Sequence, residues 1–215
     1  MSDKAVTERT LWLIVLAWAG LAAVLGHRGA FTTTPDQPPL ALLAAVALPP
    51  LLFGVAYLSS AAVRSCALSI DLRLLTALQA WRVVGVSFLV LMSFGLLPGS
   101  FAWPAGVGDA LVGLYAPFVV LAVAREAPGW RRQVLLLNVL GLLDFVGAIG
   151  SGVLAGNSPL GLLRGDVTTD VMQVLPLSLI PTFAVPFWIV IHIISLLQLR
   201  RAGAAAAAGS LRPAH

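Results

Sequence analysis

Six long apolar runs divide the chain, and the segments between them hold most of the charges and turn residues. A helix needs about 20 mainly apolar residues to cross the roughly 30 Å hydrocarbon core of a bilayer. The pattern therefore predicts an all-α, polytopic integral membrane bundle of six transmembrane helices, forming a single domain over residues 1–201. The predicted spans are 10–26, 40–63, 74–97, 101–124, 133–155 and 174–199. The alanine-rich segment 202–215 has no apolar face to bury and is predicted to be a disordered tail.

The amino-acid composition also indicates that lipid, rather than water, surrounds most of the chain. Hydrophobic residues make up 59% of the 215-residue chain and charged residues 10%, whereas soluble domains have about 25% charged residues. The net charge is +4, but the basic residues are scattered singly or in pairs, which speaks against nucleic acid as a partner. The single cysteine, Cys66, cannot form an internal disulfide or supply a zinc or iron–sulfur site by itself.

The basic residues also predict the orientation, because Lys and Arg collect on the cytoplasmic side of a membrane. With both termini in the cytoplasm, ten basic residues fall in inside segments and only Arg28 and Arg164 fall outside, with Arg82 left within the membrane. The ten are Lys4, Arg9, Arg64, Arg73, Arg125, Arg131, Arg132, Arg200, Arg201 and Arg212. Because arginine is used almost to the exclusion of lysine, and Ala, Leu and Gly are abundant, we expect a multi-pass protein of a bacterial inner (cytoplasmic) membrane.

Prolines are concentrated in two predicted helices. Pro49 and Pro50 lie in the middle of the second span, and Pro176, Pro181 and Pro186 recur at the start of the sixth. An interior proline removes a backbone hydrogen bond, so both helices are predicted to be kinked or broken against neighbours. Transporters use such discontinuous helices to build a solute site, although ordinary kinks have the same sequence signal.

Small residues of the fifth span, above all Gly152 and Gly156, have the spacing that lets two helices approach closely. Packing within the bundle is one interpretation. A homo-oligomer through the Gly152/Gly156 face is the other.

Polar side chains inside the spans are few, and each requires a partner or a purpose in hydrocarbon. The candidates for binding a substrate or a proton are Gln79, Arg82, Asp109, Tyr115, Asn138, Asp144 and His192. At 100° per residue, Gln79, Arg82, Gly85, Val86 and Ser93 share one face of the third span. Asn138, Gly141, Asp144 and Phe145, with Ala148, Ser151 and Gly152, share one face of the fifth. We expect both faces to point into the bundle, at depths that let Arg82 reach either carboxylate.

The charges of these candidate residues suggest a function for them. One arginine faces two aspartates, so one carboxylate lacks a full partner unless His192 or a bound cation supplies a second positive charge. Burial without a partner favours the protonated form of a carboxyl group. The leading hypothesis is therefore a small solute or ion carrier, linked to proton movement. The alternative is that Arg82, Asp109 and Asp144 form a static polar cluster that fixes helix register.

Two other classes remain open: a membrane-embedded enzyme acting on a lipid or quinone-like substrate, and a non-catalytic subunit or assembly factor. No catalytic or metal-binding residue is predicted, because HExxH, Walker and dinucleotide-binding motifs are missing from the sequence. Ser151 and His192 fall more than about 10 Å apart by helix rise, which excludes a Ser–His dyad. The lipid bilayer is the one partner that the sequence requires. The sequence identifies no cofactor.

Overall fold

The computed structural model describes the backbone of residues 3–210, and side chains between residues 9 and 203. The final part of the predicted tail, residues 211–215, lies outside the described residues. All regular elements in this described part are helical. They are α1 (Asp3–His27), α2 (Leu40–Ser59), α3 (Ala61–Ser69), α4 (Leu72–Leu78), η1 (Gln79–Gly85), α5 (Val86–Ser93), α6 (Gly99–Ala124), α7 (Trp130–Leu154), η2 (Asp170–Gln173), η3 (Ile180–Ala184) and α8 (Val185–Ser210).

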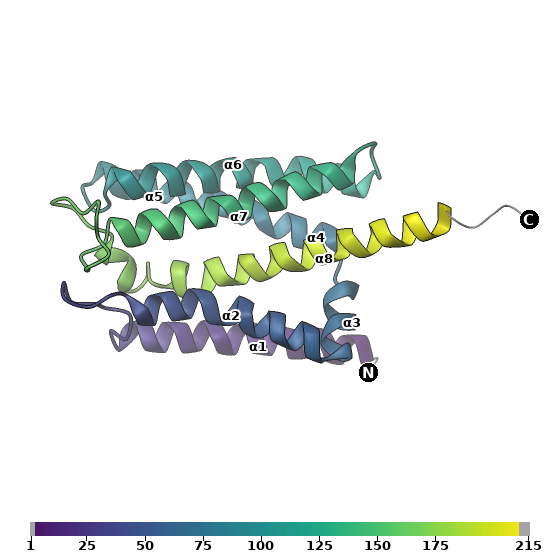
Figure 1. The fold of residues 1–215 in the computed structure, drawn as a ribbon, viewed down its shortest axis with the longest axis horizontal. Coiled ribbons are helices and arrows are strands. Elements are labelled where there is room, and N and C mark those ends of the chain that lie inside the picture. The colour runs from purple at the N-terminus through teal and green to yellow at the C-terminus, as the bar shows by residue number, and fades with distance from the viewer. Residues whose placement is uncertain (1–2, 211–215) are drawn as a thin grey trace, which may run out of the picture.

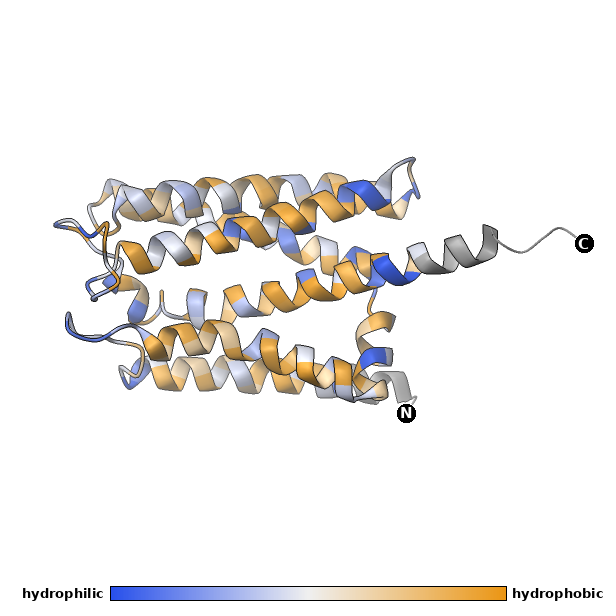
Figure 2. Ribbon diagram, viewed as in Figure 1, coloured by the Kyte–Doolittle hydropathy of each residue, from blue (hydrophilic) through white to orange (hydrophobic). Residues whose placement is uncertain are grey.

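Six helices in the described chain are long and apolar enough to cross a membrane, which confirms the predicted number of spans. They cover Arg9–His27, Leu40–Ser59, Leu72–Ser93, Gly99–Ala124, Trp130–Leu154 and Ile180–Gly203. Large apolar side chains cover their outward faces: Leu58 is 78% exposed, Phe94 75% and Val146 69%. Figure 2 shows hydrophobic colour along the helices and hydrophilic colour mainly at their ends. An apolar surface of this extent belongs in lipid, and the chain is a multi-pass membrane protein.

Three boundaries differ from the prediction. The second span ends at Ser59, because Ser60 adopts an extended conformation and its hydroxyl caps the separate helix α3. The sixth begins at Ile180 rather than 174, and Pro176 disfavours helical backbone in the residue before it. At the other end α8 runs on to Ser210, well into the segment predicted to be a disordered tail. Alanine has the highest helix propensity, which accounts for the longer helix.

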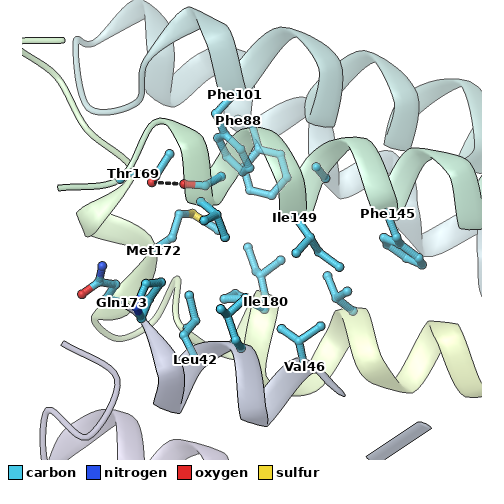
Figure 3. Close-up of a pocket in the computed structure, with 18 of the residues that line it drawn as sticks. Leu42, Val46, Phe88, Phe101, Phe145, Ile149, Thr169, Met172, Gln173 and Ile180 are labelled. Atoms are coloured by element: carbon cyan, nitrogen blue, oxygen red, sulfur yellow. Dashed lines mark hydrogen bonds between the residues drawn. The ribbon is translucent and has the colours of Figure 1, made fainter. Parts of the chain in front are cut away.

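Helix α6 lies at the centre of one half of the bundle, packed against α4, η1, α5 and α7. Helix α8 joins this half to α2, and α1 packs on η3, where Trp18 meets Phe183 edge to face at 5.0 Å between ring centroids. Between α2 and α7 lies a cavity lined by side chains of both helices (Figure 3). The start of α1 and the end of α8 lie at one end of the bundle, here called the terminal end (Figure 1). The opposite end, with residues 28–39 and 155–179, is called the loop end.

The third span is interrupted by η1, a 3-10 helix of seven residues. Such a helix has three residues per turn, so side chains three positions apart are eclipsed. Gln79, Arg82 and Gly85 therefore form one row, and all three are buried. Relative to an α-helix, seven residues of 3-10 helix add about 140° of rotation. Val86 and Ser93, predicted on the same face, are consequently exposed.

The prolines of the second and sixth spans act differently. Helix α2 continues through Pro49 and Pro50, so the predicted break does not occur there, while a kink at these prolines stays a prediction. In the sixth span the five residues Ile180–Ala184 form a π-helix with Pro181 in its first turn, before regular α8 begins. Irregular backbone thus occurs in the third and sixth spans, whereas the prolines predicted it in the second and sixth.

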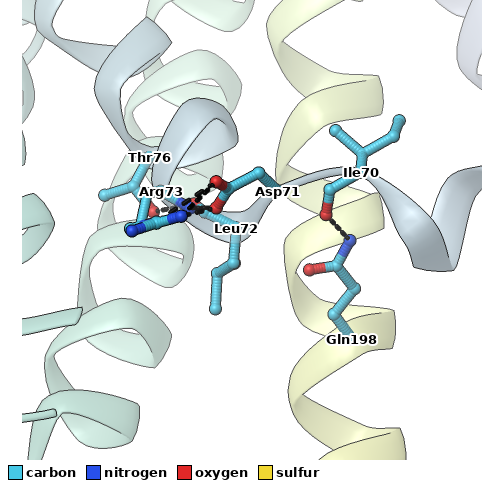
Figure 4. Close-up of polar contacts among 6 residues, drawn as sticks. All are labelled: Ile70, Asp71, Leu72, Arg73, Thr76 and Gln198. Atoms are coloured by element: carbon cyan, nitrogen blue, oxygen red, sulfur yellow. Dashed lines mark hydrogen bonds and ion pairs between the residues drawn. The ribbon is translucent and has the colours of Figure 1, made fainter. Parts of the chain in front are cut away.

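The junction between α3 and α4 is fixed by two sets of polar contacts (Figure 4). The Asp71 carboxylate caps α4, accepting a 2.8 Å hydrogen bond from the backbone N–H of Arg73, and also pairs with the Arg73 guanidinium. The side-chain hydrogen bond from Arg73 lowers the pKa of Asp71. From α8, Gln198 Nε2 donates to the carbonyl oxygens of Ala67 and Ile70 at 3.0 and 2.9 Å.

Asp71→Ala is expected to lower the free energy of unfolding by about 1 kcal/mol, the usual cost of losing a helix cap. Asp71→Asn should cost less, because asparagine also caps helices. Since the pKa of Asp71 is lowered in the folded chain, its charge stabilises the fold at neutral pH, and this contribution is lost as the pH falls through that pKa. Unfolding of both variants in detergent at neutral and acidic pH checks this. An equal effect of Asp71→Ala at both pH values would contradict it.

Candidate functional site

Arg82 projects from η1 into the middle of the bundle, where it pairs with carboxylates from two other helices. Its Nε donates to Asp109 Oδ1 of α6 at 2.7 Å, and its Nη2 donates to Asp144 Oδ2 of α7. The Arg82 side chain is fully buried, while those of Asp109 and Asp144 are 16% and 9% exposed. A planar guanidinium suits this bridging role, because its N–H groups point in several directions within one plane.

The remaining nitrogen of the guanidinium faces α7 and α8. Nη1 donates to the Gly141 carbonyl at 3.2 Å and lies 3.1 Å from His192 Nε2. A guanidinium has donors only, so Nε2 accepts and the ring proton is on Nδ1. Nδ1 then donates to Asn138 Oδ1 at 2.8 Å, and Asn138 Nδ2 donates to the Val134 carbonyl at 2.7 Å. We call these five side chains, Arg82, Asp109, Asn138, Asp144 and His192, the Arg82 cluster.

Phe145 completes the surroundings of the guanidinium. The Arg82 Cζ atom lies 3.8 Å from the centroid of the Phe145 ring, a distance typical of a cation–π contact. The same ring packs edge to face on His192, with 5.9 Å between centroids. Phe145 therefore covers one face of the positive charge with an apolar surface.

The close approach of α7 depends on Gly141. A Cβ atom built at this position would lie 2.5 Å from His192 Nε2 and 2.7 Å from Arg82 Nη1, well inside van der Waals contact. Any side chain here would displace the groups that hold the guanidinium. Glycine therefore gives both Arg82 and His192 access to the α7 backbone.

The charges of the Arg82 cluster do not cancel when both carboxyls are ionised. His192 accepts from Arg82 through Nε2, so it is neutral in this arrangement and does not supply the second positive charge that the sequence left open. One guanidinium then faces two carboxylates, which leaves one excess negative charge. Such a charge is costly within a membrane, so the cluster favours one bound cation, a proton being the smallest.

Five of the seven candidate residues thus meet in one cluster, and two do not. Gln79 lies on the same row of η1 and is buried, but neither its Oε1 nor its Nε2 has a hydrogen-bond partner among the described residues. Tyr115 is half-buried and packs on an apolar group nearer the terminal end, which includes Val112 and Leu137. Phe145 and the Gly141 carbonyl were not among the candidates, because only the fold shows that they touch Arg82.

The cavity between α2 and α7 extends from the loop end to the Arg82 cluster, and has a volume of about 90 Å³. Most of its lining is apolar, with Leu42 and Val46 of α2 facing Ile149 of α7 (Figure 3). Asp109 and Phe145 are the members of the lining that also touch Arg82. On the same measure one water molecule needs about 10–15 Å³, so the cavity has room for several waters or one small molecule.

At the loop end of this cavity, hydrogen bonds join segments that are distant in sequence. Gln173 Oε1 accepts from the Thr33 N–H at 2.8 Å, which joins the α1–α2 loop to η2. Thr169 donates to the Gly152 carbonyl at 2.6 Å. Gly152 itself lies against Phe101, and Gly156 lies against Thr169, so both glycines face their own chain. A homo-oligomer contact through them stays a prediction.

Metal binding has little support in this arrangement. Within the part of the chain that the structure describes, no group of three or more His, Cys, Asp or Glu side chains is placed to hold a metal ion.

The chain belongs to a family of proteins whose model is described as "Domain of unknown function (DUF8737)", which matches residues 39–200. The matched region begins just before α2 and contains the whole Arg82 cluster and the cavity lining. No curated protein and no solved structure matches the chain. The description of the family names no function, so the activity is inferred from the geometry of the Arg82 cluster and the cavity.

Proposed function

We propose that the protein is a small membrane carrier for a solute or ion, linked to proton movement, in which the Arg82 cluster binds and releases one positive charge. The observation that carries the proposal is the pairing of the buried Arg82 guanidinium with two carboxylates while His192 accepts from it. A fully neutralised group would serve only as structural support. One unbalanced negative charge within the membrane favours the binding of a cation by the cluster.

Two further features support a carrier. The cavity brings the Asp109 carboxylate within reach of a small molecule from the loop end, whereas a purely structural subunit would need no such space. The third and sixth spans, which carry Arg82 and His192, both contain non-α segments. Carriers commonly build their sites from interrupted helices. With the predicted topology, the loop end faces the outside of a bacterial inner membrane.

A pH jump applied to proteoliposomes on a solid-supported electrode tests the proposal. We expect a transient current from the native protein, because a proton that reaches the Arg82 cluster moves charge within the bilayer. Asp109→Asn and Asp144→Asn should each reduce this current at least about tenfold, since each removes a carboxylate that holds the unbalanced charge.

Asp71→Asn is the matched control, because it removes one exposed carboxylate outside the spans. It should leave the current unchanged. Size-exclusion profiles and thermal unfolding in detergent establish that each variant is folded. Unchanged currents in both cluster variants would rule out the carrier mechanism.

The apolar lining of the cavity favours a second candidate, an enzyme that acts on a lipid or quinone-like substrate with Asp109 as general acid or base. This candidate predicts chemical conversion of added lipid or quinone by the reconstituted protein, and no current after a pH jump.

A further inference from the structure

We infer that the cavity is a binding site for a small organic monocation with an apolar body, such as a protonated aryl or alkyl amine, and that Asp109 is its counter-ion. This inference rests on the proposed carrier function, for which it names the class of solute. Three observations carry it: which charged group faces the cavity, which side chains surround that group, and how much space they leave.

Of the two opposite charges at the inner end of the cavity, the carboxylate is the accessible one. Asp109 lines the cavity and is 16% exposed, whereas Arg82 is fully buried and does not line it. Phe145 lies over the guanidinium and itself lines the cavity, so its ring separates the positive charge from a ligand. Arg82 Nε donates to Oδ1 of Asp109, and Oδ2 lies beside Gly85, where a Cβ atom would come within 2.5 Å of it. A ligand with an N–H⁺ donor would approach the Asp109 carboxylate from the cavity.

The aromatic side chains that line the cavity also suit a cation. Three phenylalanines line the cavity, and aromatic faces attract ammonium groups. Phe88 and Phe101 lie 5.3 Å apart between centroids. The polar groups farther from Asp109 are already in use, since Thr169 donates to Gly152 and Gln173 accepts from Thr33. The unbalanced negative charge of the Arg82 cluster disfavours an anion in the same place.

The volume of the cavity limits the size of the apolar part of the ligand. An apolar cavity of about 150 Å³ accommodates benzene in a protein core, and this one is about 90 Å³. A short or branched alkyl chain therefore fits without movement of α2 or α7, and a single ring is the largest body expected, with a small outward movement of these helices. Larger lipids and quinones with long tails exceed this space.

Fluorine NMR titrations of the protein in lipid nanodiscs test the inference with three probes that share one ring: para-fluorobenzylamine, para-fluorobenzyl alcohol and para-fluorobenzoate. At neutral pH they are a cation, a neutral molecule and an anion of similar size. Empty nanodiscs correct for partition into lipid. We expect the amine to bind at least about tenfold more tightly than the alcohol, as a charge-assisted hydrogen bond implies, and the benzoate not to bind.

Two variants locate the site. Ile149→Trp should abolish binding by filling the cavity without touching the ion pairs, and Asp109→Asn should weaken amine binding about tenfold or more while leaving the alcohol unaffected. Asp71→Asn should bind the amine like the native protein. Equal binding of amine and alcohol, preferred binding of benzoate, amine binding that survives Ile149→Trp, or no binding of any probe would overturn the inference. Amine binding in a protein that gives no pH-jump current would support the site and refute the carrier.

Discussion

Replacing Arg82 with leucine is expected to cost about 3–5 kcal/mol of stability and to leave little folded protein. This is the range found when one partner of a buried ion pair is removed and the other stays behind. Here two carboxylates would lose their positive partner, and His192 and the Gly141 carbonyl would each lose a donor. Unfolding by detergent titration, together with the yield of monodisperse protein, measures the effect.

Two further variants separate charge from packing. Arg82→Lys keeps the charge, but one ammonium group cannot reproduce the planar contacts to α6, α7 and α8, so we expect an intermediate loss. Adding Asp109→Asn and Asp144→Asn to Arg82→Leu removes the unpaired carboxylates and should recover part of the stability. A stable, well-folded Arg82→Leu variant would show that the cluster does not hold the bundle together.

Gly113→Ala is expected to destabilise the protein by about 1–3 kcal/mol, because α6 and η1 have no room for a methyl group between them. A Cβ atom at this position would lie 2.5 Å from the backbone nitrogen of Val83 and 3.1 Å from the carbonyl carbon of Arg82. Backbone atoms of a packed helix cannot move aside as the end of a flexible side chain can. The displacement would also shift Arg82 away from Asp109.

Gly147→Ala is the matched control, since this glycine also lies within a membrane span and a Cβ there would meet nothing within 4 Å. It should be neutral, or stabilising by up to about 1 kcal/mol, as expected for alanine in a helix. Thermal unfolding of both variants in the same detergent compares them. Equal stability of the two variants would mean that α6 and η1 are not in close contact at Gly113.

The spans were predictable from the sequence because a membrane helix depends on a run of apolar residues, which any window along the chain detects. Arg82, Asp109 and Asp144 were equally visible, since a charge inside such a run is rare and requires partners. Helix rise alone placed them at depths where they could meet. The spans and the charges within them depend on local composition, which can be read directly from the sequence.

The 3-10 segment was not predictable, because Gln79–Gly85 contains no proline and its apolar pattern suits an α-helix as well. Its tighter winding accompanies contacts with α6, including the approach at Gly113, which no local signal reveals. The prediction that one face of the third span points into the bundle is therefore wrong beyond Gly85, because Val86 points outward. The cavity was also beyond prediction, since it lies between side chains of α2 and α7, about 100 residues apart.

Infrared difference spectroscopy on the protein in lipid bilayers, between alkaline and weakly acidic buffer in which exposed carboxylates such as Asp71 stay ionised, tests most directly whether the Arg82 cluster holds one exchangeable proton. We expect a carbonyl stretching band from a protonated carboxyl group that corresponds to one group per chain. This band should persist in Asp71→Asn and vanish when Asp109→Asn and Asp144→Asn are combined. A difference spectrum that this double substitution leaves unchanged would contradict the account.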